Sequence, residues 1–80
     1  MLSDRDKIVL RFLDDGRMEA TARQVGTELG AHGKCDGGYI AVGTGVLVDM
    51  RKRDLVARLA DLNVWRITQA GRFALSRESP

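Results

Sequence analysis

The sequence predicts an α+β fold that is mostly helical, with three helices, a β-hairpin and a closing helix. Three observations support this class. Apolar residues in the first half recur at the three- and four-residue spacing of amphipathic helices. Two short, mostly apolar runs follow, at residues 55–59 and 64–67, separated by turn-tolerant residues. The chain has 80 residues and 44% hydrophobic residues, which fits one folded domain.

The first helix is predicted over residues 4–14. Ser3 and Asp6 have the spacing of a capping box, with an aspartate in place of the usual glutamate. Gly16 follows, and glycine accepts the left-handed conformation that ends many helices. The apolar stripe of this helix consists of Ile8, Val9, Phe12 and Leu13.

A second helix is predicted over residues 22–29, after a short extended link at residues 17–20 that suits a one- or two-residue strand. Thr21 and Gln24 form a second capping box at its start. Gly30 is expected to end it.

The third helix is expected over residues 38–53, with the clearest apolar spacing in its C-terminal half. Gly43 and Gly45 lie inside it, and each glycine costs about 1 kcal/mol relative to alanine in a helix interior. An extended segment at residues 39–42, followed by a helix from Thr44, is therefore the alternative.

Asp54 is expected to end this helix and to lead into the hairpin of residues 55–59 and 64–67. Alternation along the second strand directs Trp65 and Ile67 toward the core. Stacking of Trp65 on a base or in a partner's pocket is the alternative to packing beside Phe12 or Phe73.

The closing helix begins after Thr68, a residue that commonly caps helix N-termini. Phe73 is expected to point inward, together with Ala70 and Leu75. The tail at residues 76–80 is expected to fray.

Positive charge is concentrated in the last third of the chain. Residues 1–50 hold six Lys or Arg and eight Asp or Glu, whereas residues 51–77 hold seven Lys or Arg and two Asp. The whole chain has a formal net charge of +2. A polyanion is drawn to the basic part. An arginine-rich face that only meets solvent is the alternative interpretation.

Two motifs surround the hairpin: VLVDMRKRDLVAR at residues 46–58 and WRITQAGRFAL at residues 65–75. Together they resemble the wing region of winged-helix transcription regulators, including MarR-like and PadR-like proteins. The resemblance implies a winged helix, with a three-helix core, a two-stranded β-hairpin wing and a C-terminal helix. Departures from the family pattern are a longer link between the second and third helices and an acidic wing tip at Asp61.

The resemblance also implies a DNA-binding site. In such proteins the third helix enters the major groove and the wing approaches the backbone. The base-facing candidates are then Tyr39, Thr44 and Lys34. The phosphate-facing candidates are Arg51, Lys52 and Arg53 at the end of the helix, and Arg58 and Arg66 on the wing. Residues 38–45 contain no Arg, Lys, Asn or Gln, the side chains that bind base edges in bidentate fashion.

Two functions follow from this pattern. The first is a small non-catalytic protein that binds double-stranded DNA as a transcriptional regulator or accessory factor. The second is a winged-helix module for protein–protein interaction, as an adaptor, inhibitor or subunit of a complex. The uncharged, glycine-rich residues 37–46 favour this second function, because small residues permit close approach of another backbone. Homodimerisation through the third helix and wing is a variant of it.

Enzymatic function is not expected, and neither a cofactor nor a metal ion is implied. His32 and Cys35 lie in a glycine-rich loop without the further ligands or the orienting acid that catalysis or metal binding needs. The single cysteine fits a reducing compartment. The N-terminus carries acids where a secretion signal carries bases, and no apolar run is long enough to cross a membrane. A cytoplasmic location is therefore expected.

Overall fold

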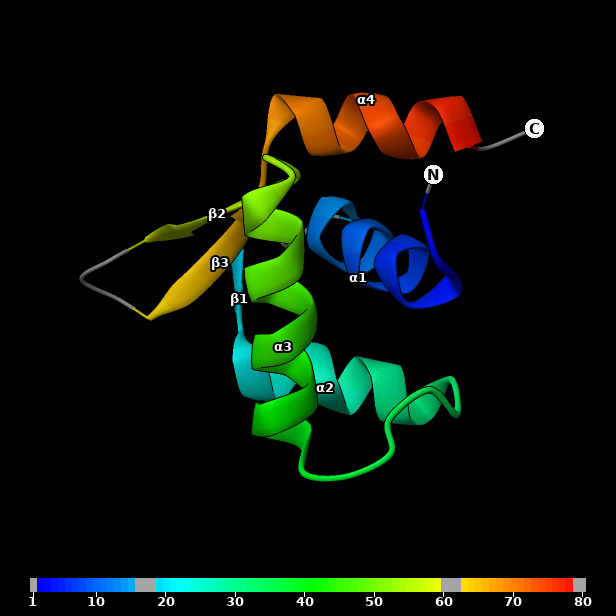
Figure 1. Ribbon diagram of the computed structural model, residues 1–80, viewed down its shortest axis with the longest axis vertical. Coiled ribbons are helices and arrows are strands. Elements are labelled where there is room, and N and C mark those ends of the chain that lie inside the picture. The colour runs from blue at the N-terminus through cyan, green and yellow to red at the C-terminus, as the bar shows by residue number, and fades with distance from the viewer. Residues whose placement is uncertain (1, 16–18, 60–62, 79–80) are drawn as a thin grey trace.

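The structure is a computed structural model that describes residues 2–15, 19–59 and 63–78. Within these residues it contains four helices and a three-stranded antiparallel sheet (Figure 1), so the α+β class predicted from the sequence is confirmed. The β2–β3 hairpin projects away from the helices, and α4 lies across one end of the molecule near α1 (Figure 1). The elements are α1 (Asp4–Asp14), β1 (Glu19–Thr21), α2 (Ala22–Ala31), α3 (Tyr39–Lys52), β2 (Val56–Leu59), β3 (Val64–Ile67) and α4 (Gln69–Glu78).

Both predicted capping boxes are present. The Ser3 hydroxyl accepts from the Asp6 backbone NH at 3.2 Å, and the Asp6 carboxylate accepts from the Ser3 backbone NH at 3.1 Å. Thr21 and Gln24 make the equivalent pair of bonds at the start of α2. Each box satisfies backbone NH groups that a helix N-terminus otherwise leaves free. The predicted bounds of α1 are confirmed, whereas its expected stop at Gly16 lies outside the described residues.

Helix α2 runs beyond its predicted end, because Gly33 and not Gly30 ends it. Gly33 has a φ of 70°. Its NH donates to the Gly30 carbonyl at 3.0 Å, and the Lys34 NH donates to the Leu29 carbonyl at 2.8 Å. These two bonds are those of a Schellman motif, which closes the last turn of a helix. The helix therefore continues to Ala31.

Helix α3 is continuous through its two interior glycines, so the alternative with an extended segment at residues 39–42 is wrong. The reason is its close packing against α2. A Cβ atom at Gly43 would overlap the Ala22 carbonyl oxygen, and one at Gly26 would overlap the Tyr39 carbonyl oxygen. Both helices need glycine where their backbones meet, and this packing offsets the poor helix propensity of Gly43.

Asp54 ends α3, as predicted. It has a φ of 67°, a conformation that Asp adopts more readily than most residues. The Asp54 NH donates to the Arg51 carbonyl and the Leu55 NH to the Met50 carbonyl, both at 3.0 Å. This second Schellman motif directs Leu55 into the core, where it is 8% exposed.

The sheet has the strand order β1-β3-β2. The predicted hairpin is thus joined by β1 (Glu19–Thr21), which confirms the short strand expected within residues 17–20 but ends one residue later. Trp65 lies opposite Arg58 of β2 and Ala20 of β1, and residues paired in this way share a face of the sheet. Trp65 and Ile67 are buried, which confirms the predicted alternation. The expected turn tip at Asp61 lies outside the described residues.

The core draws on every helix and strand of the described chain. It has no buried polar side chain left without a hydrogen-bond partner among the described residues. Its largest fully buried side chains are Leu10, Leu13, Leu29, Leu47, Met50, Val9, Val25 and Val56.

Helix α4 is capped as predicted but turns a different side to the core. The Thr68 hydroxyl accepts from the Gly71 NH at 2.9 Å. The prediction that Phe73 points inward is wrong, since this side chain is 65% exposed. Gly71 lies so close to the Leu55 carbonyl that a Cβ atom there would overlap it, and this contact fixes the rotation of the helix. Leu75 is buried as expected, whereas Ala70 is exposed.

The C-terminal end of α4 reaches Glu78, so Ser76–Glu78 are helical where a frayed tail was expected. The Leu2 backbone NH donates to a Glu78 carboxylate oxygen at 3.2 Å, and Lys7 lies 4.0 Å from the other oxygen. These contacts tie the end of α4 to the start of α1.

The packing of α2 against α3 predicts opposite effects for two glycine substitutions in one helix. Gly43→Ala should lower the free energy of unfolding by about 1–3 kcal/mol, because its methyl group overlaps backbone atoms of α2. Gly45→Ala should raise it by about 0.5–1 kcal/mol, because nothing lies within 4 Å of a Cβ there and alanine favours the helix. Urea unfolding of both variants measures the difference. Equal effects of the two substitutions would contradict the close contact.

Candidate nucleic-acid interface

Helix α3 turns one side to the core and the opposite side to solvent. Gly43, Leu47 and Met50 form the buried side. Beside it lies a group of apolar and small residues that we call the outer face of α3. It comprises Ile40, Ala41, Thr44, Gly45 and Val48, of which Ile40 is 56% exposed, whereas Val48 is half-buried and packs against the core. The exposed, charged Asp49 and Lys52 follow Gly45 and Val48 by one turn.

The three predicted base-facing residues do not share this face. Thr44 lies on it and is exposed. Tyr39 is 48% exposed, but its ring packs against α2, where a Cβ atom at Gly30 would come within 2.9 Å of the ring. Lys34 lies in the link before α3, with its ammonium 3.8 Å from the Asp4 carboxylate. Of the three, only Thr44 is presented by the outer face.

Two predicted phosphate-facing residues, Arg51 and Arg58, neighbour Trp65. The Arg51 guanidinium lies 5.9 Å from the centre of the Trp65 ring, within the range of a cation–π interaction. Arg58 pairs with Trp65 across the hairpin, on the same face of the sheet. The exposed Arg58 donates to the Asn63 side-chain oxygen at 2.9 Å. Trp65, 4% exposed, is thus a core residue that also supports Arg51 at the end of α3.

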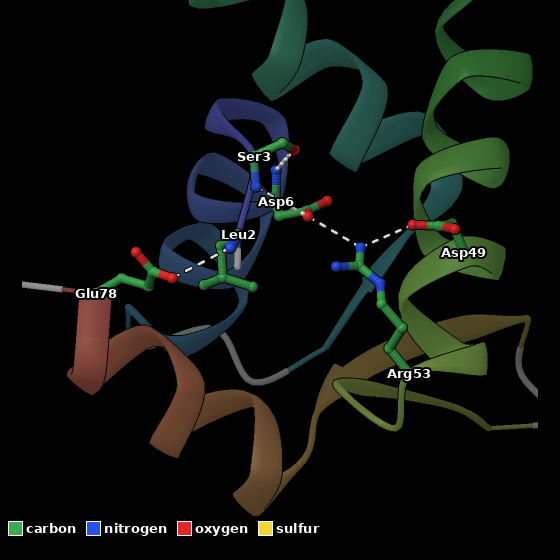
Figure 2. Close-up of polar contacts among 6 residues, drawn as sticks. All are labelled: Leu2, Ser3, Asp6, Asp49, Arg53 and Glu78. Atoms are coloured by element: carbon green, nitrogen blue, oxygen red, sulfur yellow. Dashed lines mark hydrogen bonds and ion pairs between the residues drawn. The ribbon is translucent and has the colours of Figure 1, made fainter.

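Arg53, another predicted phosphate-facing residue, is held in two ion pairs. Figure 2 shows its guanidinium between Asp6 of α1 and Asp49 of α3, at 2.9 and 2.7 Å. The hydrogen bond from Arg53 to Asp6 raises the pKa of the guanidinium above its ordinary value, although partial burial opposes the shift. A phosphate group at this position would have to compete with two carboxylates. Arg53 therefore joins α3 to α1 and is not presented as a free cation.

Arg66 points to the other side of the sheet from Arg58. It lies opposite Ala57 of β2 and Glu19 of β1, whereas Arg58 lies opposite Trp65. Because neighbouring residues of a strand alternate between faces, one flat surface cannot contact both arginines through the sheet. The five predicted phosphate-facing residues therefore do not form a single surface.

Some Lys and Arg side chains of the described chain are held in ion pairs with carboxylates, and others are not. Among the described residues, carboxylates pair with Arg5, Lys7, Lys34, Arg53 and Arg72. The described cations without an ion pair to a described carboxylate are Arg11, Arg23, Arg51, Lys52, Arg58, Arg66 and Arg77. Of these, Arg51, Lys52 and Arg58 are exposed at the end of α3 and on the hairpin face that carries Trp65, and we call these three residues the basic patch.

The loop residues His32 and Cys35 each contact a different partner. His32 Nε2 lies 3.1 Å from the Glu28 carboxylate, and Cys35 Sγ lies 3.6 Å from the Gly37 carbonyl oxygen. Across residues 2–15, 19–59 and 63–78, no three His, Cys, Asp or Glu side chains are grouped so that they could hold a metal ion. No described helix is both long and apolar enough to cross a bilayer.

Comparisons with known proteins return no match to a protein family, to a curated protein or to a solved structure. Function is therefore inferred from the arrangement of the residues.

Sequence reasoning singled out the uncharged residues 37–46 but missed the row of Ile40, Thr44 and Val48 and the role of Arg53. The outer face has a local signal, since Ile40, Thr44 and Val48 recur every four residues along one helix. The Arg53–Asp6 pair has no such signal, because 47 positions separate the two residues.

The ion pairs of Arg53 predict that this residue and its neighbour Lys52 contribute differently to stability. Arg53→Gln should lower the free energy of unfolding by about 1–2 kcal/mol, because the buried Asp6 carboxylate loses its charged partner. This range allows for the partial exposure of Arg53, which weakens the pair. Lys52→Gln, on the exposed surface, should change it by less than about 0.5 kcal/mol. Equal losses in thermal or urea unfolding would count against a structural role for Arg53.

Proposed function

We propose that this protein is a winged-helix protein that binds double-stranded DNA without catalysing a reaction. The outer face of α3 enters the major groove, and the basic patch contacts phosphates beside it. The observation that carries the proposal is that Arg51 and Arg58 both neighbour Trp65, Arg51 over its ring and Arg58 across the hairpin, without an ion pair to a described carboxylate. A role as a transcriptional regulator or accessory factor follows from such binding.

The arrangement of the elements supports this proposal. Two helices pack closely at the core, an antiparallel hairpin follows the second of them, and a short strand joins its edge. The motifs at residues 46–58 and 65–75 resemble a winged helix, and a winged helix has the same order of elements. In that arrangement α3 is the recognition helix and the β2–β3 hairpin is the wing.

The electrostatics of the basic patch support a polyanionic partner. Each Lys or Arg that neutralises a phosphate releases a condensed counterion, which favours binding at low salt. Arg51 is held in place by Trp65 and Arg58 by Asn63, so both guanidinium groups are partly ordered before any ligand binds. Ordering before binding reduces the entropy that association costs.

A second candidate is a protein-interaction module, and the outer face of α3 favours it. This face is uncharged, and its largest exposed side chain, Ile40, is 56% exposed. A protein partner or a second copy of the chain would cover such a surface through apolar contacts. Light scattering over a range of concentrations tests the form of this candidate in which a second copy covers the face, because the mass of a self-associating chain rises with concentration.

Binding of duplex DNA should depend steeply on salt. For the three cations of the basic patch, the slope of log K against log salt concentration should be about −0.9 per phosphate neutralised, or roughly −3 in total. Fluorescence anisotropy of a labelled duplex of about 20 base pairs, titrated at several salt concentrations, measures this slope. The triple change of Arg51, Lys52 and Arg58 to Gln should flatten it. An absence of binding at low salt would refute the proposed function.

The opposite orientations of Arg58 and Arg66 provide a matched pair of charge reversals. Arg58→Glu should weaken duplex binding by about tenfold or more, because it places a carboxylate in the basic patch. Arg66→Glu changes the net charge of the protein equally, but it acts on the other side of the sheet and should have a much smaller effect. Equal losses in the same anisotropy assay would indicate that overall charge, and not this surface, governs binding.

A further inference from the structure

We propose that the outer face of α3 contacts the 5-methyl groups of thymines in the major groove, so that duplexes with thymine beneath α3 are preferred. This inference rests on the DNA binding proposed above and specifies the base chemistry that the helix contacts. Phosphate contacts by the basic patch give no role to the apolar side chains of the outer face.

The side chains of this face can make apolar contacts but few hydrogen bonds. Ile40, Ala41 and Val48 are hydrocarbon, and Thr44 adds a methyl group and one hydroxyl. In the major groove, hydrogen-bonding base edges are distinguished mainly by Arg, Lys, Asn, Gln and acidic side chains, and this face has none of them. The thymine methyl is the apolar group that a base pair presents there. The chemistry of the outer face therefore matches thymine.

The spacing of the face fits a groove contact over several base pairs. Ile40, Thr44 and Val48 lie four residues apart on one side of the helix. At 1.5 Å per residue they span roughly 12 Å, which equals about three to four base-pair steps of 3.4 Å. Gly45 lies about 100° around the helix from Thr44, and nothing lies within 4 Å of a Cβ built there. Its missing side chain leaves room for a close approach to that border of the row.

Charges at the border of the face favour DNA as its occupant. Arg51 and Lys52 follow Val48 by one turn and are exposed. Asp49, the acidic residue nearest in sequence, lies about 100° around the helix from Val48 and faces Arg53. A polyanion that covers the row of Ile40, Thr44 and Val48 thus meets cations at its end, whereas Asp49 lies on the side of Gly45 and is paired with Arg53. A protein partner or a second copy is the other way to cover these side chains.

The test compares duplexes that differ only in the methyl group at C5. An alternating dA·dT duplex of about 20 base pairs is measured against the same duplex with deoxyuridine in place of thymidine. An alternating dG·dC duplex is measured against its 5-methylcytosine form. The wild-type protein should bind the two methylated duplexes more tightly, by about fourfold for each methyl that it contacts.

Two variants identify the residues responsible. Thr44→Ser removes one methyl and keeps the hydroxyl, and Ile40→Ala shortens an exposed side chain, so neither should perturb the fold. Each should reduce the ratio between thymidine and deoxyuridine affinities. Arg51→Gln is the matched control, because it should weaken binding to all four duplexes by the same factor and leave the ratio unchanged. Circular dichroism melting confirms that the variants are folded.

Each remaining outcome overturns a particular statement. Equal affinity for methylated and unmethylated duplexes would overturn the thymine contact and leave the proposed DNA binding in place. An absence of binding to every duplex at low salt would overturn both. Self-association in light scattering that Ile40→Asp abolishes, without a methyl effect, would assign the face to a second copy of the chain.

Discussion

The close contact between α2 and α3 is the constraint on which the candidate site depends. Neither Gly26 nor Gly43 can carry a side chain without overlap with the backbone of the other helix. This contact fixes the rotation of α3 about its axis. It therefore decides that Leu47 faces the core while Ile40 and Thr44 face solvent. A bulkier residue at either glycine would force the helices apart and turn a different set of side chains outward.

A second constraint distributes the charges. Arg53 at the end of α3 reaches Asp6, which also caps α1, so one buried carboxylate serves both a helix start and a contact between helices. Its neighbours Arg51 and Lys52 point elsewhere, and Arg51 rests over Trp65. The adjacent residues Arg51, Lys52 and Arg53 therefore have different roles. One stabilises the fold and the others form the patch that we assign to phosphate contact.

Features with a local signal could be predicted, and features that depend on distant contacts could not. Capping boxes such as Ser3 with Asp6 place helix starts within a few residues, because the hydrogen bonds close within one turn. The side of α4 that faces the core was predicted wrongly. The contact of Gly71 with Leu55 sets the rotation of the helix, and the apolar character of Phe73 gives no sign of that contact. The same holds for the candidate site. Strand alternation separates Arg66 from Trp65, but the register that places Arg58 opposite Trp65 and the partners of Arg53 depend on the fold.

The central claim is that one surface, made of the outer face of α3 and the basic patch, binds duplex DNA. Amide chemical-shift mapping of the ¹⁵N-labelled protein with a short duplex tests it most directly. The account predicts that the perturbed amides cluster at Ile40, Thr44, Val48, Arg51 and Arg58, and that Phe73 on the exposed side of α4 is unaffected. Perturbations centred on α4, or none at low salt, would contradict it.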